Sequence, residues 1–224
     1  MVRKAQAWLA ALLLALFVTQ AAMADKQVTL TFLGDCTIGC EERLMGQEYG
    51  FAKTAEREGY GYFFQKVLPL LAADDLTIAN FEGVLKADAG RRANKTYCFR
   101  GLPELAQIMK LGSVEAVTLA NNHTGDYGIL GYESTWAALV AAGVQTVDTS
   151  NPYVVEVKGV KIGVVGIYAA GYFAKRKMMK DAVQRARDAL QAEHPHLQRT
   201  RTVDFVEIAQ DEYDSSMHLL YEGA

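Results

Sequence analysis

Three short apolar runs, each ended abruptly by polar residues, constrain the fold of this chain more than any other feature. The runs are QVTLTFLGD (27–35), LTIANFEG (76–83) and VEAVTLANNH (114–123), and helical patterns lie between them. Strands that alternate with helices predict an α/β fold with much parallel pairing. In such sheets ligands bind at the carboxyl ends of the strands. We therefore expect the three polar clusters to meet on one rim.

The remaining patterns extend this prediction along the chain. Helical patterns cover 62–75, 103–112, 131–143 and 174–193, and Pro69 should bend or shorten the first of these helices. An alternating run over 153–168 turns at Lys158–Gly159 like a hairpin. Residues 84–102 resemble a long exposed loop. After residue 193 the apolar content falls, with one strand-like piece at 202–209. We expect a domain over 25–193 and a divergent or shortened tail over 194–224.

The N-terminus has the pattern of a secretory signal peptide. Arg3 and Lys4 precede the apolar run AWLAALLLALFV, and AAMA follows with a small-residue cleavage site at Ala24. A retained membrane anchor is the alternative, but a spanning helix needs about 20 apolar residues. We expect residues 1–24 to be removed, no transmembrane segment to be retained, and a secreted, periplasmic or cell-surface protein to begin near Asp25.

Composition excludes some classes of function. Half of the 224 residues are hydrophobic, 22% are charged, and the formal net charge is −3. This balance indicates a globular protein and gives no basis for nucleic-acid binding. Cys36, Cys40 and Cys98 make an odd cysteine count, so either one disulfide forms (Cys36–Cys40 or Cys40–Cys98) or all three thiols stay free.

The polar clusters contain residues that suit a metal site. Asp35, Glu82 and Asn122 offer oxygen donors that Mn²⁺, Mg²⁺ or Ca²⁺ prefer, and added imidazoles would extend the choice to Zn²⁺ or Fe. His123 beside a metal can act as a general acid. Each residue also has a structural explanation, since Gly-Asp pairs and asparagines are common in turns.

The motifs FLGDCTIG, TIANFEG, YCFRGLPE and VTLANNHTGDYGILG resemble those of the CapA-type poly-γ-glutamate capsule synthesis family. That family belongs to the calcineurin-like metallophosphoesterase fold group. The resemblance implies an α/β/β/α sandwich with a dinuclear Mn, Zn or Fe centre at the strand ends. It implies metal ligation by Asp35, Glu82 and Asn122 and a catalytic role for His123. Asn80, Asn121 and Asp126 would be supporting residues.

The C-terminal part departs from the family pattern. An HWG-type and a GHHPH-type motif, which supply histidine ligands in the family, are not evident. EHPHLQ offers His194 and His196, and SMHLLYEG offers His218 and Glu222, as weaker candidate ligands. With so few histidines, we expect weak metal affinity and little catalysis.

Three hypotheses of function follow. The leading one is a secreted or cell-surface capsule protein with a metal-dependent hydrolase-type site, whose partners are the capsule polymer or its biosynthetic membrane complex. The second is a protein that binds an anionic polymer without cleaving it. The third is a shortened, inactive fragment with an exposed sheet edge.

Overall fold

The computed structural model describes residues 27–88, 90–92, 94–168, 172–193 and 215–222. Its central element is a four-stranded parallel sheet in the order β1-β3-β6-β7. These strands are β1 (Leu30–Cys36), β3 (Leu76–Phe81), β6 (Ala116–Thr118) and β7 (Gln145–Val147). The three strands expected from the apolar runs are therefore confirmed, and β7 is an additional strand that the sequence pattern did not reveal.

A second sheet is antiparallel and has the order β10-β9-β8. Strands β8 (Tyr153–Val157) and β9 (Val160–Tyr168) form the expected hairpin, and β10 (Ser215–Glu222) pairs along the other edge of β9. Lys158 and Gly159 have φ angles of 52° and 74°. Positive φ at both central residues is what a tight hairpin turn requires.

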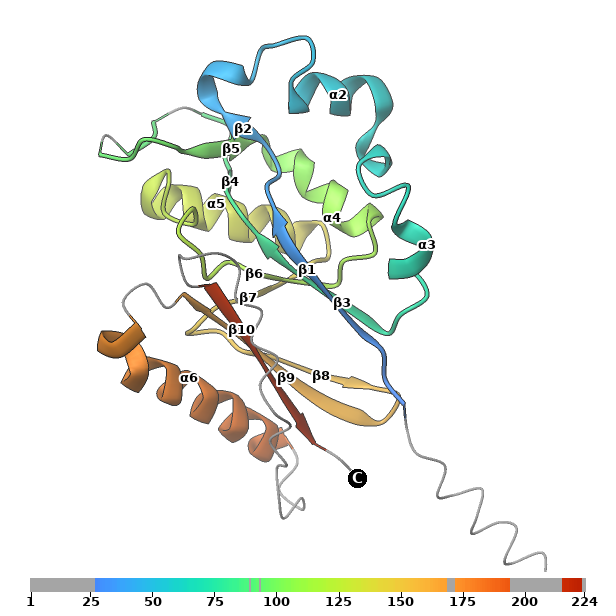
Figure 1. Ribbon diagram of the computed structural model, residues 1–224, viewed down its shortest axis with the longest axis vertical. Coiled ribbons are helices and arrows are strands. Elements are labelled where there is room, and N and C mark those ends of the chain that lie inside the picture. Colours follow the sequence, from blue (N-terminus) through green and yellow to red (C-terminus); the bar gives the residue numbers. More distant parts are fainter. Residues whose placement is uncertain (1–26, 89, 93, 169–171, 194–214, 223–224) are drawn as a thin grey trace, which may run out of the picture.

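The two sheets face each other and helices cover their outer faces (Figure 1). Alternation along β3 divides its side chains between two cores, because successive side chains point to opposite faces. Ile78 packs in the core between the sheets with Ile162 and Val164 of β9, while Phe81 packs on the helix side. The helices on that side are α4 (Gln107–Leu111) and α5 (Gly128–Ala141).

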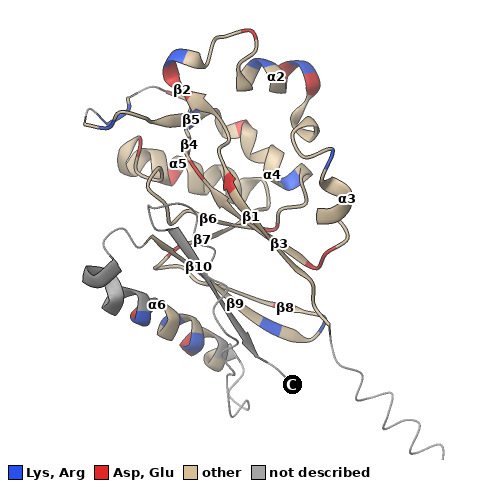
Figure 2. Cartoon of the chain, in the orientation of Figure 1, with Lys and Arg blue, Asp and Glu red and all other residues tan. Residues whose placement is uncertain are grey.

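The outer face of the antiparallel sheet is covered by α6 (Tyr172–Glu193), whose Ala186 packs with Val165 and Ile167. The order of layers is therefore helix, sheet, sheet, helix, which confirms the expected metallophosphoesterase-like α/β/β/α class. Acidic and basic residues alternate along the described part of α6 (Figure 2), as expected for a solvated helix face.

The two sheets are in close contact at Gly166 of β9. A Cβ at this position would lie 2.2 Å from the Thr118 hydroxyl oxygen of β6. Since no side chain fits in that space, glycine lets the carboxyl end of β9 pack directly against the parallel sheet.

A small third sheet occupies part of the expected loop over 84–102. Strand β5 (Phe99–Gly101) pairs with β2 (Cys40–Glu41) on one side and β4 (Val84–Leu85) on the other. The expectation of an exposed loop was therefore wrong at both ends of the segment. Short strands of two or three residues carry too little periodicity to be recognised from sequence.

The helix expected over 62–75 is shortened, as Pro69 predicted, to a single short α-helix. Only α3 (Leu68–Leu71) is α-helical there, and Tyr60–Tyr62 form a 3₁₀ turn, η2. Pro69 lies in the first turn of α3. Proline fits the first turn but clashes with a preceding one, so the helix begins at Leu68 instead of crossing it.

The remaining elements connect these layers. They are η1 (Glu42–Leu44), α2 (Phe51–Glu58) and η3 (Pro103–Ala106). Among the described residues, no helix combines the length and apolar character that crossing a membrane requires. The predicted signal peptide, the strand-like piece at 202–209, and His194 and His196 lie outside the described residues.

Candidate functional site

The carboxyl ends of β1, β3 and β6 meet at one rim, as the sequence predicted. In the strand register Asp35 lies opposite Asn80, and Asn80 lies opposite Thr118. The side chains of two clusters are directly joined, because the Asn80 amide donates to an Asp35 carboxylate oxygen at 2.5 Å. The Asn121 amide in turn donates to the Asn80 side-chain oxygen at 2.9 Å.

Asn121 and Asn122 have different environments although they are neighbours. The buried Asn121 side chain also donates to the Phe81 carbonyl at 2.8 Å, and its oxygen accepts from the backbone N–H groups of His123 and Thr124 at 2.9 and 3.0 Å. Asn122 is exposed. Asn121 therefore holds the turn after β6 against β3, and the Asn122 side chain stays accessible on the rim.

His123 is buried with its two ring nitrogens near two carboxylates. Its Nδ1 lies 2.8 Å from an Asp126 oxygen, and its Nε2 lies 3.6 Å from a Glu82 oxygen. The ring stacks on Phe99, with centroids 4.4 Å apart. Phe99 and Asp126 thus fix the plane and rotation of the imidazole, and Nε2 is left on the side of Glu82. A ring held in this way can transfer a proton at Nε2.

Asp126 is fully buried at the centre of this network. Besides His123, it accepts a hydrogen bond from the Phe99 backbone N–H at 2.7 Å and forms an ion pair with Lys95. The Lys95 ammonium also donates to the Asn122 carbonyl at 2.7 Å and lies 3.2 Å from His123 Nδ1. The supporting role predicted for Asp126 has a structural basis in these contacts.

Lys95 is a site residue that the sequence analysis missed. It precedes the YCFRGLPE motif by two positions and is 31 residues from Asp126. Its segment looked like an exposed charged loop, and a lysine in such a loop is usually solvated. The nearby motif was the only local signal that could have directed attention to it.

The rim offers some of the donors that a metal requires. Asp35 is exposed, and the Glu82 carboxylate is mostly buried and accepts from the Thr37 hydroxyl at 2.8 Å. Within the described ranges, no group of three or more His, Cys, Asp or Glu residues is arranged to hold a metal ion. The candidate oxygen donors at the rim are therefore the carboxylates of Asp35 and Glu82 and the side-chain amide of Asn122.

The weaker candidate ligands are placed as follows. In β10 the register sets His218 opposite Val165 and Glu222 opposite Lys161. The structure describes the backbone there, so ligation by these two residues stays a prediction, as it does for His194 and His196. The cysteines are all free thiols. Burial, helped by the Asp35 charge, raises the pKa of Cys36 to about 11, so this thiol is protonated at neutral pH.

Comparison with known proteins decides the family. The family model "Bacterial capsule synthesis protein PGA_cap" matches residues 29–218. The chain belongs to this bacterial capsule synthesis protein family. The resemblance found in the motifs is thereby confirmed.

Several curated proteins are similar to this member of the capsule synthesis family. Capsule biosynthesis protein CapA of Bacillus anthracis is 28% identical over 166 residues, which cover 68% of this chain and 38% of that protein. PGA biosynthesis protein CapA of Bacillus subtilis (strain 168) is 26% identical over 165 residues, or 68% of this chain and 41% of that protein. A probable polyglutamine synthesis accessory protein of Mycobacterium tuberculosis is 30% identical over 116 residues, or 47% of this chain and 30% of that protein. The matches thus span well under half the length of these relatives.

Proposed function

We propose that this chain acts outside the cytoplasm in the synthesis or export of a poly-γ-glutamate capsule, and that the rim is its working site. The names of its relatives refer to capsule, PGA and polyglutamine synthesis. The observation that carries the proposal is the placement of His123 between two carboxylates, because a buried imidazole oriented by Asp126 on one side and facing Glu82 on the other is an arrangement suited to proton transfer.

The reaction we propose is a hydrolase-type step on an amide or ester of the polymer. A water molecule would attack the carbonyl carbon while the bond to the amide nitrogen or ester oxygen breaks. His123 would give its Nε2 proton to that leaving atom, and the proton lost by the attacking water would restore it. Asp126 and Phe99 would hold the ring. Asn80 and Asn121 would keep the strand ends in register through their hydrogen bonds. In this scheme each residue of the rim has one task, and no task requires a residue outside the described ranges.

A divalent cation is part of the proposal for an electrostatic reason. Asp35 and Glu82 place two carboxylates on the rim, and both would repel an anionic polymer. A cation held by Asp35, Glu82 and the Asn122 amide would remove that repulsion and polarise the scissile group. Because these donors are too few for a closed site, we expect the affinity for Mn²⁺ or Zn²⁺ to be weak.

A second candidate function is polymer binding without cleavage. It is favoured by three cations in the segment that crosses the rim, Arg91, Arg92 and Lys95. This segment is tied to the site by the hydrogen bond from the Arg92 backbone N–H to the Asp126 carbonyl, at 2.9 Å, and by the Lys95 contacts. Clustered cations attract a polyanion with a strength that falls as salt rises.

The test uses the purified chain and an Asp35→Ala variant in thermal melts with and without Mn²⁺ or Zn²⁺. Asp35 is exposed, so we expect the variant to fold. Binding to the folded state raises the melting temperature by mass action. We expect a small rise for the parent chain and none for Asp35→Ala. Equal shifts in both proteins, or no shift in either, would reject the metal role of the rim.

Polymer binding and cleavage are then measured with poly-γ-glutamate. The first candidate predicts metal-dependent release of new amino groups that is lost in His123→Gln. The second predicts binding without cleavage that is insensitive to metal and weakened by Arg92→Gln. A chain that neither binds nor cleaves the polymer would contradict both.

A further inference from the structure

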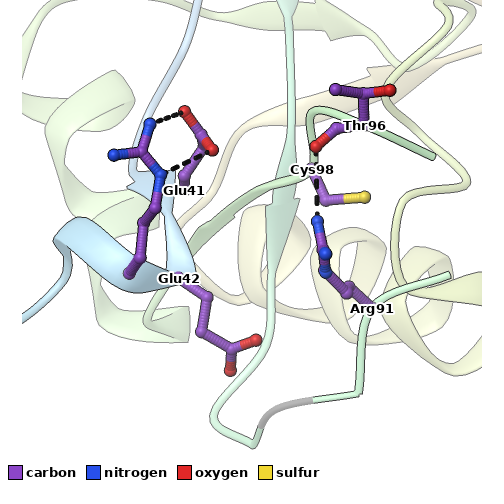
Figure 3. Close-up of a pocket in the computed structure, with 6 residues that line it drawn as sticks. Glu41, Glu42, Arg91, Thr96 and Cys98 are labelled. Carbon is purple, nitrogen blue, oxygen red and sulfur yellow. Dashed lines mark hydrogen bonds and ion pairs between the residues drawn. The ribbon is translucent and has the colours of Figure 1, made fainter. Parts of the chain in front are cut away.

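A cavity lies beside the small three-stranded sheet, and none of its lining residues belongs to the Asp126–His123 network. It has a volume of about 530 Å³ and is lined by Glu41, Glu42, Arg43, Arg91, Thr96 and Cys98 (Figure 3). Ligand sites for small molecules commonly measure about 300–1,000 Å³. We call this cavity the mixed-charge pocket, because its wall carries two carboxylates and two guanidinium groups.

The charges in the mixed-charge pocket are not all neutralised by one another. Arg43 and Glu41 form a bidentate pair, with distances of 2.8 and 3.1 Å. Figure 3 shows Glu41 on one side of the pocket and Arg91 on the other. Arg91 donates to the Thr96 backbone carbonyl at 3.3 Å, a neutral acceptor. Its positive charge therefore remains available to an anionic group.

Glu42 provides the accessible negative charge of the pocket, and the buried Arg100 holds its carboxylate in place. Its carboxylate accepts from the Arg100 guanidinium at 3.3 Å, and its side chain is 35% exposed. Arg100 is itself buried, and it donates to the Lys86 and Ala87 carbonyls at 2.9 Å each. One carboxylate of the pocket is thus fixed on a buried anchor and still accessible to a ligand.

The interior behind the pocket also contains a polar group without a partner. Arg100 Nε is buried and has no hydrogen-bond partner among the described residues, and the guanidinium of Arg100 lies 6.0 Å from the centroid of the Tyr127 ring. Tyr127 packs with Cys98, which forms a buried part of the pocket wall, and burial together with the Glu42 charge raises the pKa of Tyr127. Buried polar groups without a partner are rare in proteins and commonly mark a place where a ligand or water completes the network.

We propose that the mixed-charge pocket binds the free amino end of a γ-linked glutamyl chain, with the α-ammonium on Glu42 and the α-carboxylate on Arg91. The chemistry of the γ-linkage gives the reason. Its peptide bond uses the side-chain carboxyl, so the first residue keeps both its α-ammonium and its α-carboxylate. Internal residues keep the α-carboxylate alone. A pocket with one accessible charge of each sign therefore distinguishes a chain end from the chain interior.

Two consecutive residues, Cys98 and Phe99, connect the pocket to the rim. Cys98 lines the pocket, and the adjacent Phe99 stacks on His123 and donates its backbone N–H to Asp126. This inference rests on the proposed function for the identity of the polymer. The pocket itself requires an amino acid head group with both charges, whatever the rim does.

The test measures binding of three short peptides to the full chain by calorimetry. They are γ-linked triglutamate, its N-acetylated form, and α-linked triglutamate, which is an isomer of the first with the same net charge. The α-linked isomer has a free α-ammonium but has its first α-carboxyl in a peptide bond. We expect at least tenfold weaker binding of the second and third peptides. Equal affinity for all three would overturn the inference.

Two variants of the pocket test whether the peptide binds at Glu42 and Arg91. Glu42→Gln keeps an oxygen for Arg100 but removes the charge, and Arg91→Gln removes the opposite charge. Each is expected to weaken γ-linked triglutamate at least tenfold, while Arg57→Gln, an exposed control on α2, leaves binding unchanged. Thermal melts verify that each variant is folded. Unchanged binding in Glu42→Gln would overturn the inference.

Long poly-γ-glutamate, tested in parallel, separates this inference from the proposed function. If the polymer binds while the short peptides fail to discriminate, the pocket assignment is overturned and the capsule function is retained. If γ-linked triglutamate binds as expected while the rim neither binds nor cleaves the long polymer, the pocket assignment stands and the proposed function of the rim is rejected.

Discussion

The rim of the parallel sheet and the core between the two sheets are stabilised by different interactions. The rim contains buried polar side chains, of which Asp126 and Asn121 are each held by several directional hydrogen bonds. The core between the sheets consists of aliphatic side chains such as Ile78 and Ile162. Apolar burial is non-directional and tolerates substitution of similar volume, whereas a buried polar group left without its partner is costly. The positions of individual side-chain atoms are therefore fixed more strictly at the rim than in the core, as a functional site requires.

The largest expected effect comes from breaking the rim network at its centre. Asp126→Ala would leave Lys95, His123 and the Phe99 N–H without their shared acceptor, at a cost of about 3–5 kcal/mol in the free energy of unfolding. Urea denaturation measures it. Asp126→Asn is the matched control, because it keeps the size and one acceptor oxygen, and we expect it to lose less. A change below about 1 kcal/mol in Asp126→Ala would show that the network does not stabilise the rim.

An apolar truncation between the sheets sharpens the comparison. Ile162→Ala removes buried methyl groups at a site 1% exposed and should cost about 3 kcal/mol. Ile162→Val is the control and should cost about 1 kcal/mol. Unlike Asp126→Ala, this variant should bind poly-γ-glutamate as the parent does once it is folded. Loss of polymer binding in folded Ile162→Ala would mean that the two regions are coupled.

The contact between the regions is tested at Gly166. An added Cβ would lie 2.2 Å from the Thr118 oxygen, directly below the turn that carries Asn121. Gly166→Ala must therefore shift β6 or β9, and we expect a loss of about 1–3 kcal/mol in urea denaturation. Gly61→Ala, where no atom lies within 4 Å, is the control and should be close to neutral. Equal stability of the two variants would contradict close packing of the sheets.

The smallest effect is expected at Tyr132, which joins α5 to the segment after β7. Its hydroxyl donates to Asp148 at 2.6 Å, and burial, together with this bond, raises its pKa to about 12. The unfolded value is about 10, so this tyrosine stabilises the fold below pH 10 and the contribution is lost as the pH rises toward 12.

Tyr132→Phe should cost about 1 kcal/mol at neutral pH. It should also flatten the fall in the free energy of unfolding between pH 10 and 12, as followed by urea denaturation at each pH. An identical pH profile in the parent and the variant would contradict the assignment of this titration to Tyr132.

The sequence predicted the structure correctly where a segment had regularly spaced apolar residues or a recognisable motif. Alternation predicted the hairpin over 153–168, and the apolar runs predicted strands β1, β3 and β6, whose carboxyl ends carry the polar clusters at Asp35, Asn80 and Asn121. Over 62–75 the apolar spacing is helical, but Pro69 shortens the helix to Leu68–Leu71. Strands β2, β4 and β5 were not predicted, because they are too short to show an alternation of apolar and polar residues.

By itself, the sequence determined the family, the fold class and the residues that end the parallel strands, because each of these depends on a local pattern of apolar and polar positions. The tertiary structure alone decided which partners those residues have. Lys95 reaches Asp126 across 31 positions, and Glu42 meets Arg100 across 58. Such pairs depend on how loops from separate strands pack against one another, and that packing produces no periodic pattern in the sequence.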